Sequence, residues 1–365
     1  MNIAFVLLTH NPSEPAGIER SVASLADGLR ELGHHAVIVA AGPATGADGP
    51  HLLRLDSLTL PRPIVYDEAL NLLTDPEPVC REVRRLLREH DVDLVCWVDA
   101  VVGLGYLAPA PPGTRTALMV HFLRTDERML ESLAHRPDAV LTVSDFLTDE
   151  ARRAGLDTEG WLSLPNALPR QGTAPPEGER ERLRRGGPVR TLARADPQKG
   201  ISELLRAFPR DLGRPVDIVL ASAGFEFRAG MQDRVIAECR ALAASLPGVS
   251  ILPALPWQEV QPFLAGAAVA VLPSILPETF GNVAAEALSV GTPVVGYGLG
   301  HLPTLTGAAG RMLDLVDGPE RLWRAAAELL DDPDAYHAAA RQAPLQVAEH
   351  TPARIAEAFL RATGL

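Results

Sequence analysis

Residues 269–297 read VAVLPSILPETFGNVAAEALSVGTPVVGY, and this stretch decides the fold class. It begins with a short apolar run (269–272), continues through a loop into an apolar helical pattern (283–288), and ends in a second apolar run (293–297). Two short apolar runs joined by a helix are typical of a βαβ unit, whose strands are parallel and buried under helices. We therefore predict a parallel α/β sheet in this part of the chain.

The same alternation of strand-like and helix-like segments occurs twice along the chain. In the first part the sequence predicts strands at 3–8, 36–41, 94–98, 116–120 and 139–143, and helices at 18–32 and 79–89. Further strands are predicted at 190–193, 216–221 and 249–252, and helices at 201–208, 231–245, 260–265, 319–330 and 352–362. Gly33 follows the first helix in the position of a C-cap glycine.

Residues 169–189 separate these two parts of the chain. The segment is rich in Pro, Gly, Glu and Arg and contains no apolar run, which favours a domain linker, with one long surface loop as the alternative. A length of 365 residues also suggests two domains. We predict Rossmann-like domains over 1–168 and 190–351 that face a cleft, because ligands of open parallel sheets bind beyond the carboxyl ends of the strands.

Composition excludes several classes of protein. The formal net charge of −12 argues against non-specific nucleic-acid binding. Cys80, Cys96 and Cys239 are far apart and odd in number, which argues against a disulfide framework or a zinc site and fits a reducing cytoplasm. No apolar run approaches the ~18 residues that a membrane-spanning helix needs. The apolar start at 3–8 is interpreted as a strand and not as a signal peptide.

The loop and helix that follow residue 272 carry the strongest chemical signal. Gly281 and Asn282 can open a helix whose first N–H groups favour an anion, and Gly281 allows a ligand to approach the backbone closely. Glu278 and Glu286 flank this position, and carboxylates accept hydrogen bonds from sugar hydroxyls. The pattern suits a nucleotide sugar with its diphosphate at the helix end. From spacing alone, two solvated surface carboxylates are an equal alternative.

A second signal lies in the loop after the first strand of the predicted second domain. Arg194 and Lys199 are two cations that can hold a diphosphate and stabilise the charge of a leaving group. Lys199 is the only lysine among 34 basic side chains, and lysine is a compact point charge whereas arginine is a planar fork. The two motifs together favour a phosphate site over an ordinary solvated loop.

These motifs, in this order, resemble those of glycosyltransferase family 4, a group of retaining enzymes with the GT-B fold of two Rossmann-like domains. Glu278 and Glu286 match its E-x7-E signature. The similarity extends over most of the chain and also includes Ala16-Gly17-Ile18-Glu19-Arg20 (glycine-rich loop), Leu164-Pro165-Asn166 (end of the first domain), Arg194 with Lys199-Gly200 (diphosphate clamp), and Gly291-Thr-Pro-Val. The chain departs from the family pattern in three places: Ala167 replaces a glycine, Thr304 stands where the family has an acidic residue, and the loop at Gly17 has one glycine of a common pair.

The resemblance implies roles for individual residues. Glu286 would bind the ribose hydroxyls of the donor, Glu278 would contact the transferred sugar, and Arg194 and Lys199 would hold the diphosphate. His121, at the end of a predicted strand, would lie near the reacting sugar, with a hydrogen-bonded core histidine as the alternative. The remaining donor-binding positions that the family suggests are Gly17, Phe280, Gly281, Asn282 and Val283.

The implied reaction is transfer from a UDP-, GDP- or dTDP-sugar to a hydroxyl acceptor with retention at the anomeric carbon, without a cofactor and without a metal ion. The resemblance also implies that the last helix, within 352–365, packs back on the first domain. The first domain shows no basic amphipathic helix, which favours a small acceptor such as an aminocyclitol over a lipid.

Three other functions are compatible with parts of the pattern. A nucleotide-sugar epimerase or hydrolase would use the same donor without an acceptor. A non-enzymatic sugar-binding protein would have little reason to keep the two carboxylates together with Arg194 and Lys199. A nicotinamide-dependent dehydrogenase is disfavoured because no G-x-G-x-x-G follows the strand at 3–8.

Overall fold

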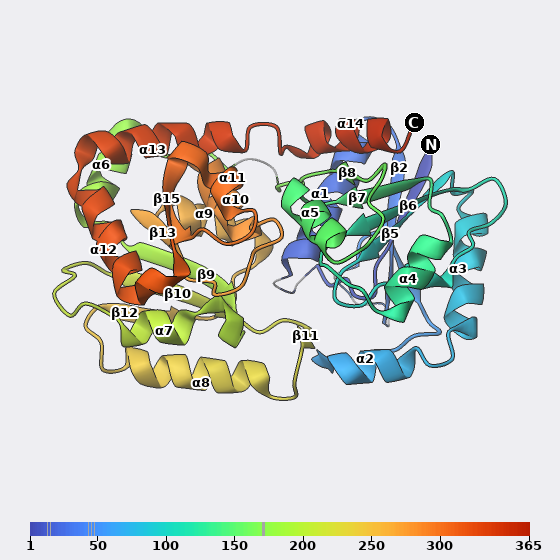
Figure 1. Ribbon diagram of the computed structural model, residues 1–365, viewed down its shortest axis with the longest axis horizontal. Coiled ribbons are helices and arrows are strands. Elements are labelled where there is room, and N and C mark those ends of the chain that lie inside the picture. Colours follow the sequence, from blue (N-terminus) through green and yellow to red (C-terminus); the bar gives the residue numbers. More distant parts are fainter. Residues whose placement is uncertain (13, 15, 43, 45, 47, 170–171) are drawn as a thin grey trace. The chain divides into compact units, whose positions relative to one another are not determined.

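The structure is a computed structural model that describes residues 1–12, 14, 16–42, 44, 46, 48–169 and 172–365. The chain forms two compact units (Figure 1). Unit 1 comprises Met1–Pro169, Gly224–Phe227 and His350–Leu365, and unit 2 comprises Arg170–Ala223 and Arg228–Glu349. Both ends of the chain therefore belong to unit 1.

Unit 1 is built around a seven-stranded parallel sheet with the order β3-β2-β1-β5-β6-β7-β8. Its strands are β1 (Asn2–Val6), β2 (His35–Ala41), β3 (Leu52–Leu55), β5 (Leu94–Asp99), β6 (Arg115–Val120), β7 (Ala139–Thr142) and β8 (Leu162–Ser163). A separate pair joins β4 (Ile64–Val65) to β11 (Phe225–Glu226). The helices are α1 (Gly17–Glu31), α2 (Tyr66–Leu72), α3 (Glu77–Glu89), η1 (Gly105–Leu107), α4 (Glu127–Ala134), α5 (Asp145–Arg153) and α14 (Pro352–Ala362).

One face of this sheet is covered by α1 and α14, which lie side by side in Figure 1. Alternate residues of β1, among them Phe5, point to this face, as the period of two in a strand requires. The ring of Phe5 packs 5.5 Å from that of Phe359 in α14, and both side chains are fully buried. The chain can approach closely here because Gly28 of α1 has no Cβ, which would lie 2.1 Å from the carbonyl oxygen of Pro352.

Unit 2 contains a six-stranded parallel sheet with the order β12-β10-β9-β13-β14-β15. Its strands are β9 (Val189–Arg194), β10 (Val216–Ala221), β12 (Val249–Leu252), β13 (Val269–Leu272), β14 (Val294–Tyr297) and β15 (Gly310–Leu313). The helices are α6 (Glu177–Gly186), η2 (Pro197–Lys199), α7 (Ile201–Arg206), α8 (Met231–Ala243), α9 (Trp257–Ala265), α10 (Asn282–Ser289), α11 (Leu302–Thr306), η3 (Gly307–Ala309), η4 (Leu315–Asp317), α12 (Gly318–Asp331) and α13 (Pro333–Gln346).

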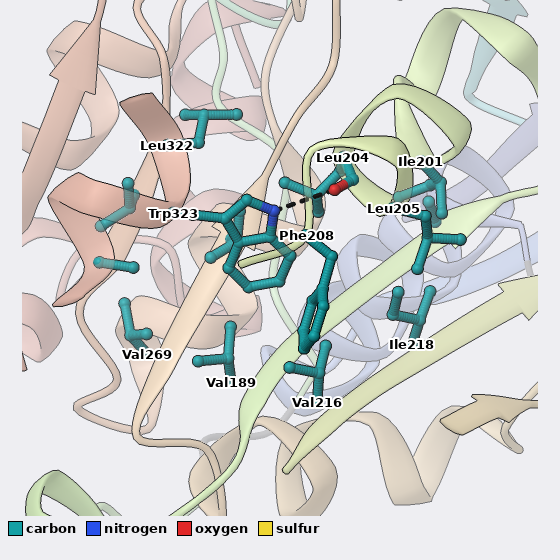
Figure 2. Packing of buried hydrophobic residues seen from close by; sticks show 14 of the residues in the cluster. Val189, Ile201, Leu204, Leu205, Phe208, Val216, Ile218, Val269, Leu322 and Trp323 are labelled. Carbon is teal, nitrogen blue, oxygen red and sulfur yellow. Dashed lines mark hydrogen bonds between the residues drawn. The ribbon is translucent and has the colours of Figure 1, made fainter. Parts of the chain in front are cut away.

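The main core of unit 2 lies between the sheet and helices α7, α8 and α12. Trp323 of α12 is 2% exposed, and its indole nitrogen donates a 2.9 Å hydrogen bond to the carbonyl oxygen of Leu204 in α7 (Figure 2). The ring of Phe208 packs against it edge to face, with centroids 5.5 Å apart. Trp323 thus joins two helices through both its apolar ring and its polar nitrogen.

In both sheets, the chain adds strands first on one side of its first strand and later on the other side. In unit 1 the chain leaves β1 toward β2 and later returns on the other side with β5; in unit 2 it leaves β9 toward β10 and returns with β13. In open parallel sheets the loops at the carboxyl ends of two such neighbouring strands separate and form the ligand site. The fold therefore places one candidate binding position beside β1 and β5, and another beside β9 and β13.

Most predicted elements are confirmed with boundaries within three residues. The strand predictions at 216–221, 249–252 and 269–272 and the helix prediction at 352–362 agree residue for residue. Gly33 follows α1 with φ +85°, as a C-cap glycine does. Several elements were not anticipated, among them the helices α2, α4, α5, α11 and α13, the short strands β3, β8 and β15, and α6, which lies in the segment predicted as a linker. The buried guanidinium of Arg180 anchors α6 to unit 2 by donating to the carbonyl oxygens of Ala267 and Val290.

We expect Trp323→Phe to lower the free energy of unfolding of unit 2 by about 1–3 kcal/mol, because it leaves the carbonyl of Leu204 without its partner and opens a small cavity. Urea unfolding followed by circular dichroism measures this change. Val316→Ala is the control, since Val316 is 92% exposed and should change stability by less than about 0.5 kcal/mol. Equal stabilities of the two variants would contradict this role for Trp323.

Candidate active site

The loop after β9 holds the two predicted cations. Arg194 is the last residue of β9 and donates a 2.9 Å hydrogen bond to the carboxylate of Asp196, which is 2% exposed. The other oxygen of Asp196 accepts from the backbone nitrogen of Gln198 and caps the short helix η2, whose last residue is Lys199. Asp196 thus orders the loop and neutralises part of the charge of Arg194.

A glycine brings this loop against the loop that follows β13. Gly200 has φ +66°, and a Cβ at this position would lie 2.1 Å from the carbonyl oxygen of Pro273. The backbone nitrogen of Ile275 also donates to the carbonyl of Gln198 at 2.9 Å. Any larger side chain would separate the two loops, so Gly200 is required for Lys199 to reach the segment around Glu278.

Lys199 and Glu278 form an ion pair. The ammonium group of Lys199 donates to Oε1 of Glu278, and the hydroxyl of Ser274 donates to the same oxygen at 2.7 Å. Their side chains are 29% and 23% exposed, so both remain accessible. Burial by itself would raise the pKa of Glu278. The charge and hydrogen bond of Lys199, with help from Ser274 and Arg194, outweigh it and hold that pKa below its ordinary value.

Helix α10 begins next to this ion pair. Its N-cap is Gly281, with φ +96°, where a Cβ would lie 2.7 Å from a methyl group of Leu302. Asn282 and Val283 form the first turn, whose backbone N–H groups have no acceptor within the helix and favour an anion. Phe280 is 2% exposed and stacks on His301 with ring centroids 5.9 Å apart. A donor would therefore meet the backbone of Phe280 and not its ring.

Glu286 lies in α10 and is only 1% exposed. A burial this deep excludes the solvated surface position that spacing alone left open for it. Charged carboxylates are seldom buried without a function or a partner that compensates for the lost hydration. Glu278, bound to Lys199 and Ser274, is likewise not a freely solvated side chain.

Unit 1 contains the other two predicted site residues. Gly17 is the first residue of α1, and Glu19 in the same helix accepts hydrogen bonds of 2.7 Å from the hydroxyl of Thr9 and the backbone nitrogen of Asn11. His121 directly follows β6 and is 1% exposed; its backbone nitrogen donates to the carbonyl of Asp99 at 2.8 Å. Nε2 of His121 is buried without a hydrogen-bond partner among the described residues.

Burial lowers the pKa of His121 to about 3, so its imidazole is neutral near pH 7. A neutral imidazole can donate or accept a hydrogen bond but cannot stabilise negative charge as a cation. Nε2 has no hydrogen-bond partner among the described residues, whereas most buried polar atoms in proteins have one.

Sequence reasoning missed several polar residues at the same strand ends. Ser274 holds Glu278, and the backbone nitrogen of His301 donates to the carbonyl of Glu278 at 2.8 Å. In unit 1, Asp99 ends β5 and is bonded to Arg124. Asp99 could have been noticed, because it is a carboxylate that ends an otherwise apolar strand. Ser274 and His301 carry no signal of their own outside the resemblance.

No group of three or more His, Cys, Asp or Glu side chains that could hold a metal ion occurs in the part of the chain that the structure describes. Among the same residues, no helix combines the length and apolar character required to cross a bilayer.

Comparison with known proteins identifies the family. The description "Glycosyltransferase Family 4" matches residues 15–170, and "Glycosyl transferases group 1" matches residues 189–332. The chain is 30% identical to the MMP alpha-(1->4)-mannosyltransferase of Mycolicibacterium hassiacum over 86% of this chain and 85% of that protein. It is also 30% identical to the D-inositol 3-phosphate glycosyltransferase of Thermobispora bispora over 65% of this chain, a match that spans about half (54%) of that relative.

A solved structure shows the same fold. Anabaena HepE in complex with UDP and glucose superposes with a TM-score of 0.72 at 16% identity, covering 99% of each chain. The chain therefore belongs to glycosyltransferase family 4 and has the GT-B fold, with two parallel α/β units.

We expect Lys199→Met to raise the pKa of Glu278, because the substitution removes the largest influence that lowers it and leaves burial unopposed. Titration of ¹³C-labelled glutamate carboxyls by NMR measures the shift. A lowered carboxyl pKa contributes stability that is lost as the pH falls through it, so unit 2 should also lose less stability on acidification in the variant.

Arg206→Met is the control for this titration, since Arg206 forms an exposed pair with Glu238 in the same unit. It should leave the pKa of Glu278 unchanged. A Glu278 titration curve that is identical in wild type and Lys199→Met would show that the ion pair does not form in solution.

Proposed function

We propose that this protein is a retaining glycosyltransferase that moves a sugar from a UDP-, GDP- or dTDP-sugar to a hydroxyl group of an acceptor. The observation that carries the proposal is the ion pair of Lys199 with Glu278 beside the N-terminus of α10. In one place it combines a cation for a diphosphate, a carboxylate for sugar hydroxyls, and backbone N–H groups for an anion.

The donor is assigned to unit 2. The diphosphate would lie against the first turn of α10, at Gly281, Asn282 and Val283, with Arg194 and Lys199 on its other oxygens. Glu278 would accept hydrogen bonds from the transferred sugar. Buried Glu286 would accept them from the two ribose hydroxyls, and the nucleoside would then lie farther along α10.

Donor binding replaces the internal ion pair. A diphosphate offers Lys199 a stronger anion than Glu278 does, and this exchange leaves the carboxylate of Glu278 available for the sugar. Both side chains are partly exposed, so a donor can reach them without unfolding the loop. The ion pair thereby keeps both side chains ordered at low cost.

In the reaction, the bond between the anomeric carbon and the diphosphate oxygen breaks while the acceptor oxygen bonds to the same face of that carbon. The acceptor proton passes to the departing phosphate oxygen, so no nucleophile from the protein is required. Negative charge grows on the phosphate as the bond breaks, and Lys199 and Arg194 stabilise it there. These two cations and the helix end supply the electrostatic role that a metal ion has in other transferases.

The acceptor is assigned to unit 1, and the family resemblance gives His121 a role with the reacting sugar and Gly17 a role with the donor phosphates. A small polyol such as an aminocyclitol is the proposed acceptor, and the exposed carboxylates Glu127 and Glu131 on α4 support it. Carboxylates hydrogen-bond to hydroxyl groups and attract an ammonium group. The three cysteines are free and buried, which supports a reducing cytoplasm as the compartment.

A nucleotide-sugar epimerase or hydrolase is the second candidate, because it would use the same donor residues. The two are separated by offering acceptors together with each donor and identifying products by mass spectrometry. Turnover that does not depend on any acceptor would favour the epimerase or hydrolase.

We expect Glu286→Gln to weaken nucleotide binding by about 10- to 100-fold, because hydrogen bonds to a charged acceptor are worth about 1.5–3 kcal/mol each and an amide is a weaker acceptor. Calorimetry with UDP, GDP and dTDP measures the dissociation constants. Glu238→Gln, on the exposed side of α8, is the control and should bind as the wild type does. Unchanged affinity for all three nucleotides in Glu286→Gln would refute the ribose role.

We expect Lys199→Ala to lower kcat by ~100-fold or more, comparable to the loss of one donor to a developing oxyanion. Lys199→Arg should restore little, because the planar guanidinium does not fit where a compact ammonium group approaches Glu278 and the phosphate. Steady-state kinetics and melting temperatures are compared for both variants. Full activity of Lys199→Arg would mean that position 199 needs only a positive charge.

A further inference from the structure

The segment between β6 and α4 contains a buried arginine held between two carboxylates. Nη1 of Arg124 donates to Oδ1 and Oδ2 of Asp99 at 3.0 and 2.8 Å. Nε and Nη2 donate to the two oxygens of Asp126 at 2.8 and 2.7 Å. The side chains of Arg124 and Asp99 are 7% and 1% exposed, so water has little access to this pair.

These contacts attach the segment 121–126 to the fold at both of its ends. At its start, the backbone nitrogen of His121 donates to the carbonyl of Asp99 in β5. At its end, Asp126 is the N-cap of α4, where Oδ1 accepts from the backbone nitrogen of Met129 at 3.2 Å. Arg124 connects the two ends, because one guanidinium binds both carboxylates in a fixed planar geometry.

The surrounding backbone fixes the position of the Asp99 carboxylate. A Cβ on Gly103 would lie 2.1 Å from Oδ2 of Asp99, so the backbone after β5 packs directly on the carboxylate. Burial raises the pKa of Asp99 to about 6 even though Arg124 lowers it. Pairs of this kind are often no more stabilising than apolar side chains of similar size, which indicates that the pair serves geometry more than stability.

The residue whose place is set by this arrangement is His121. Its imidazole is buried, neutral, and leaves Nε2 without a partner among the described residues. No hydrogen bond between this ring and Arg124 is present, so Arg124 can influence it only through the backbone of the segment. We propose that Arg124, held by Asp99, is a positioning residue that sets the orientation of the His121 imidazole toward the reacting sugar, an inference that rests on the proposed role of His121.

NMR of the full-length protein with ¹³C- and ¹⁵N-labelled histidine tests this proposal directly. The imidazole signal of His121 is assigned by its loss in His121→Gln. In Arg124→Lys and Asp99→Asn, this signal should shift and broaden or split, because the segment is no longer held in one conformation. The signal does not depend on knowing the donor or the acceptor.

Asp138→Asn is the matched control. Asp138 accepts from the backbone nitrogen of Thr116 at 2.8 Å, near the other end of the same strand β6. This variant removes a carboxylate that is bonded to β6 but lies outside the segment 121–126, and the His121 signal should stay in place. If Arg124→Lys does not fold, the double variant Asp99→Leu/Arg124→Met replaces both charges with apolar groups and should fold, still with an altered His121 signal.

Steady-state kinetics provide a second test of the positioning role of Arg124. Displacing a reacting group by about 1 Å can cost up to ~100-fold in rate, so Arg124→Lys should lower kcat by about 10- to 100-fold. The dissociation constant of UDP should change by less than about twofold, because the nucleotide is assigned to residues of unit 2. A structural defect alone would lower the melting temperature and the active fraction in proportion, without a selective loss of kcat.

The outcomes separate this inference from the proposed function. A His121 signal that is unchanged in Arg124→Lys, Asp99→Asn and the double variant would overturn the positioning role. Full transfer activity in His121→Gln would overturn the role of His121 in the reaction, while the NMR signals would still show whether Arg124 orients its ring.

Discussion

The pairing of β9 with β13 is the constraint on which the candidate site of unit 2 depends. The two strands are about eighty residues apart in sequence but adjacent in the sheet, so their following loops meet. Gly200 then permits a contact with the carbonyl of Pro273 that no other residue could make. Only with these two loops in contact does Lys199 reach Glu278, beside the first turn of α10, and each proposed role of these residues follows from that proximity.

Two ion pairs of opposite character stand at the strand ends of the two units. Lys199 and Glu278 are partly exposed, so each can give up its contact with the other and bind a ligand in its place. This suits residues that bind and release a donor. Arg124 and Asp99 are almost completely buried, and breaking that pair would leave an uncompensated charge inside the protein. The first pair is therefore suited to function by opening, and the second by staying closed.

The predicted elements were recovered well wherever apolar residues recur with the period of a strand or a helix, as in β10, β13 and α14. Among the elements that the sequence did not predict, two are held in place by residues far away in the chain. Helix α6 has little apolar character of its own and is held by the guanidinium of Arg180, which reaches Val290, over a hundred residues away. Helix α13 is fixed in part by the hydroxyl of Tyr336, which donates to the carbonyl of Ala268 at 2.8 Å. Local patterns cannot anticipate such partners.

The sequence by itself determined the parallel α/β class, the family resemblance, and the residue types expected around a nucleotide sugar, because periodicity and motif spacing are local properties of the chain. Only the tertiary structure decided that Glu278 is paired with Lys199, that Glu286 is buried, and that His121 is neutral with Nε2 still in need of a partner. The tertiary structure also revealed that Arg124 links Asp99 to the segment 121–126, which begins at His121. Desolvation and charge pairing depend on which distant residues surround a side chain, and this is settled when the sheets assemble.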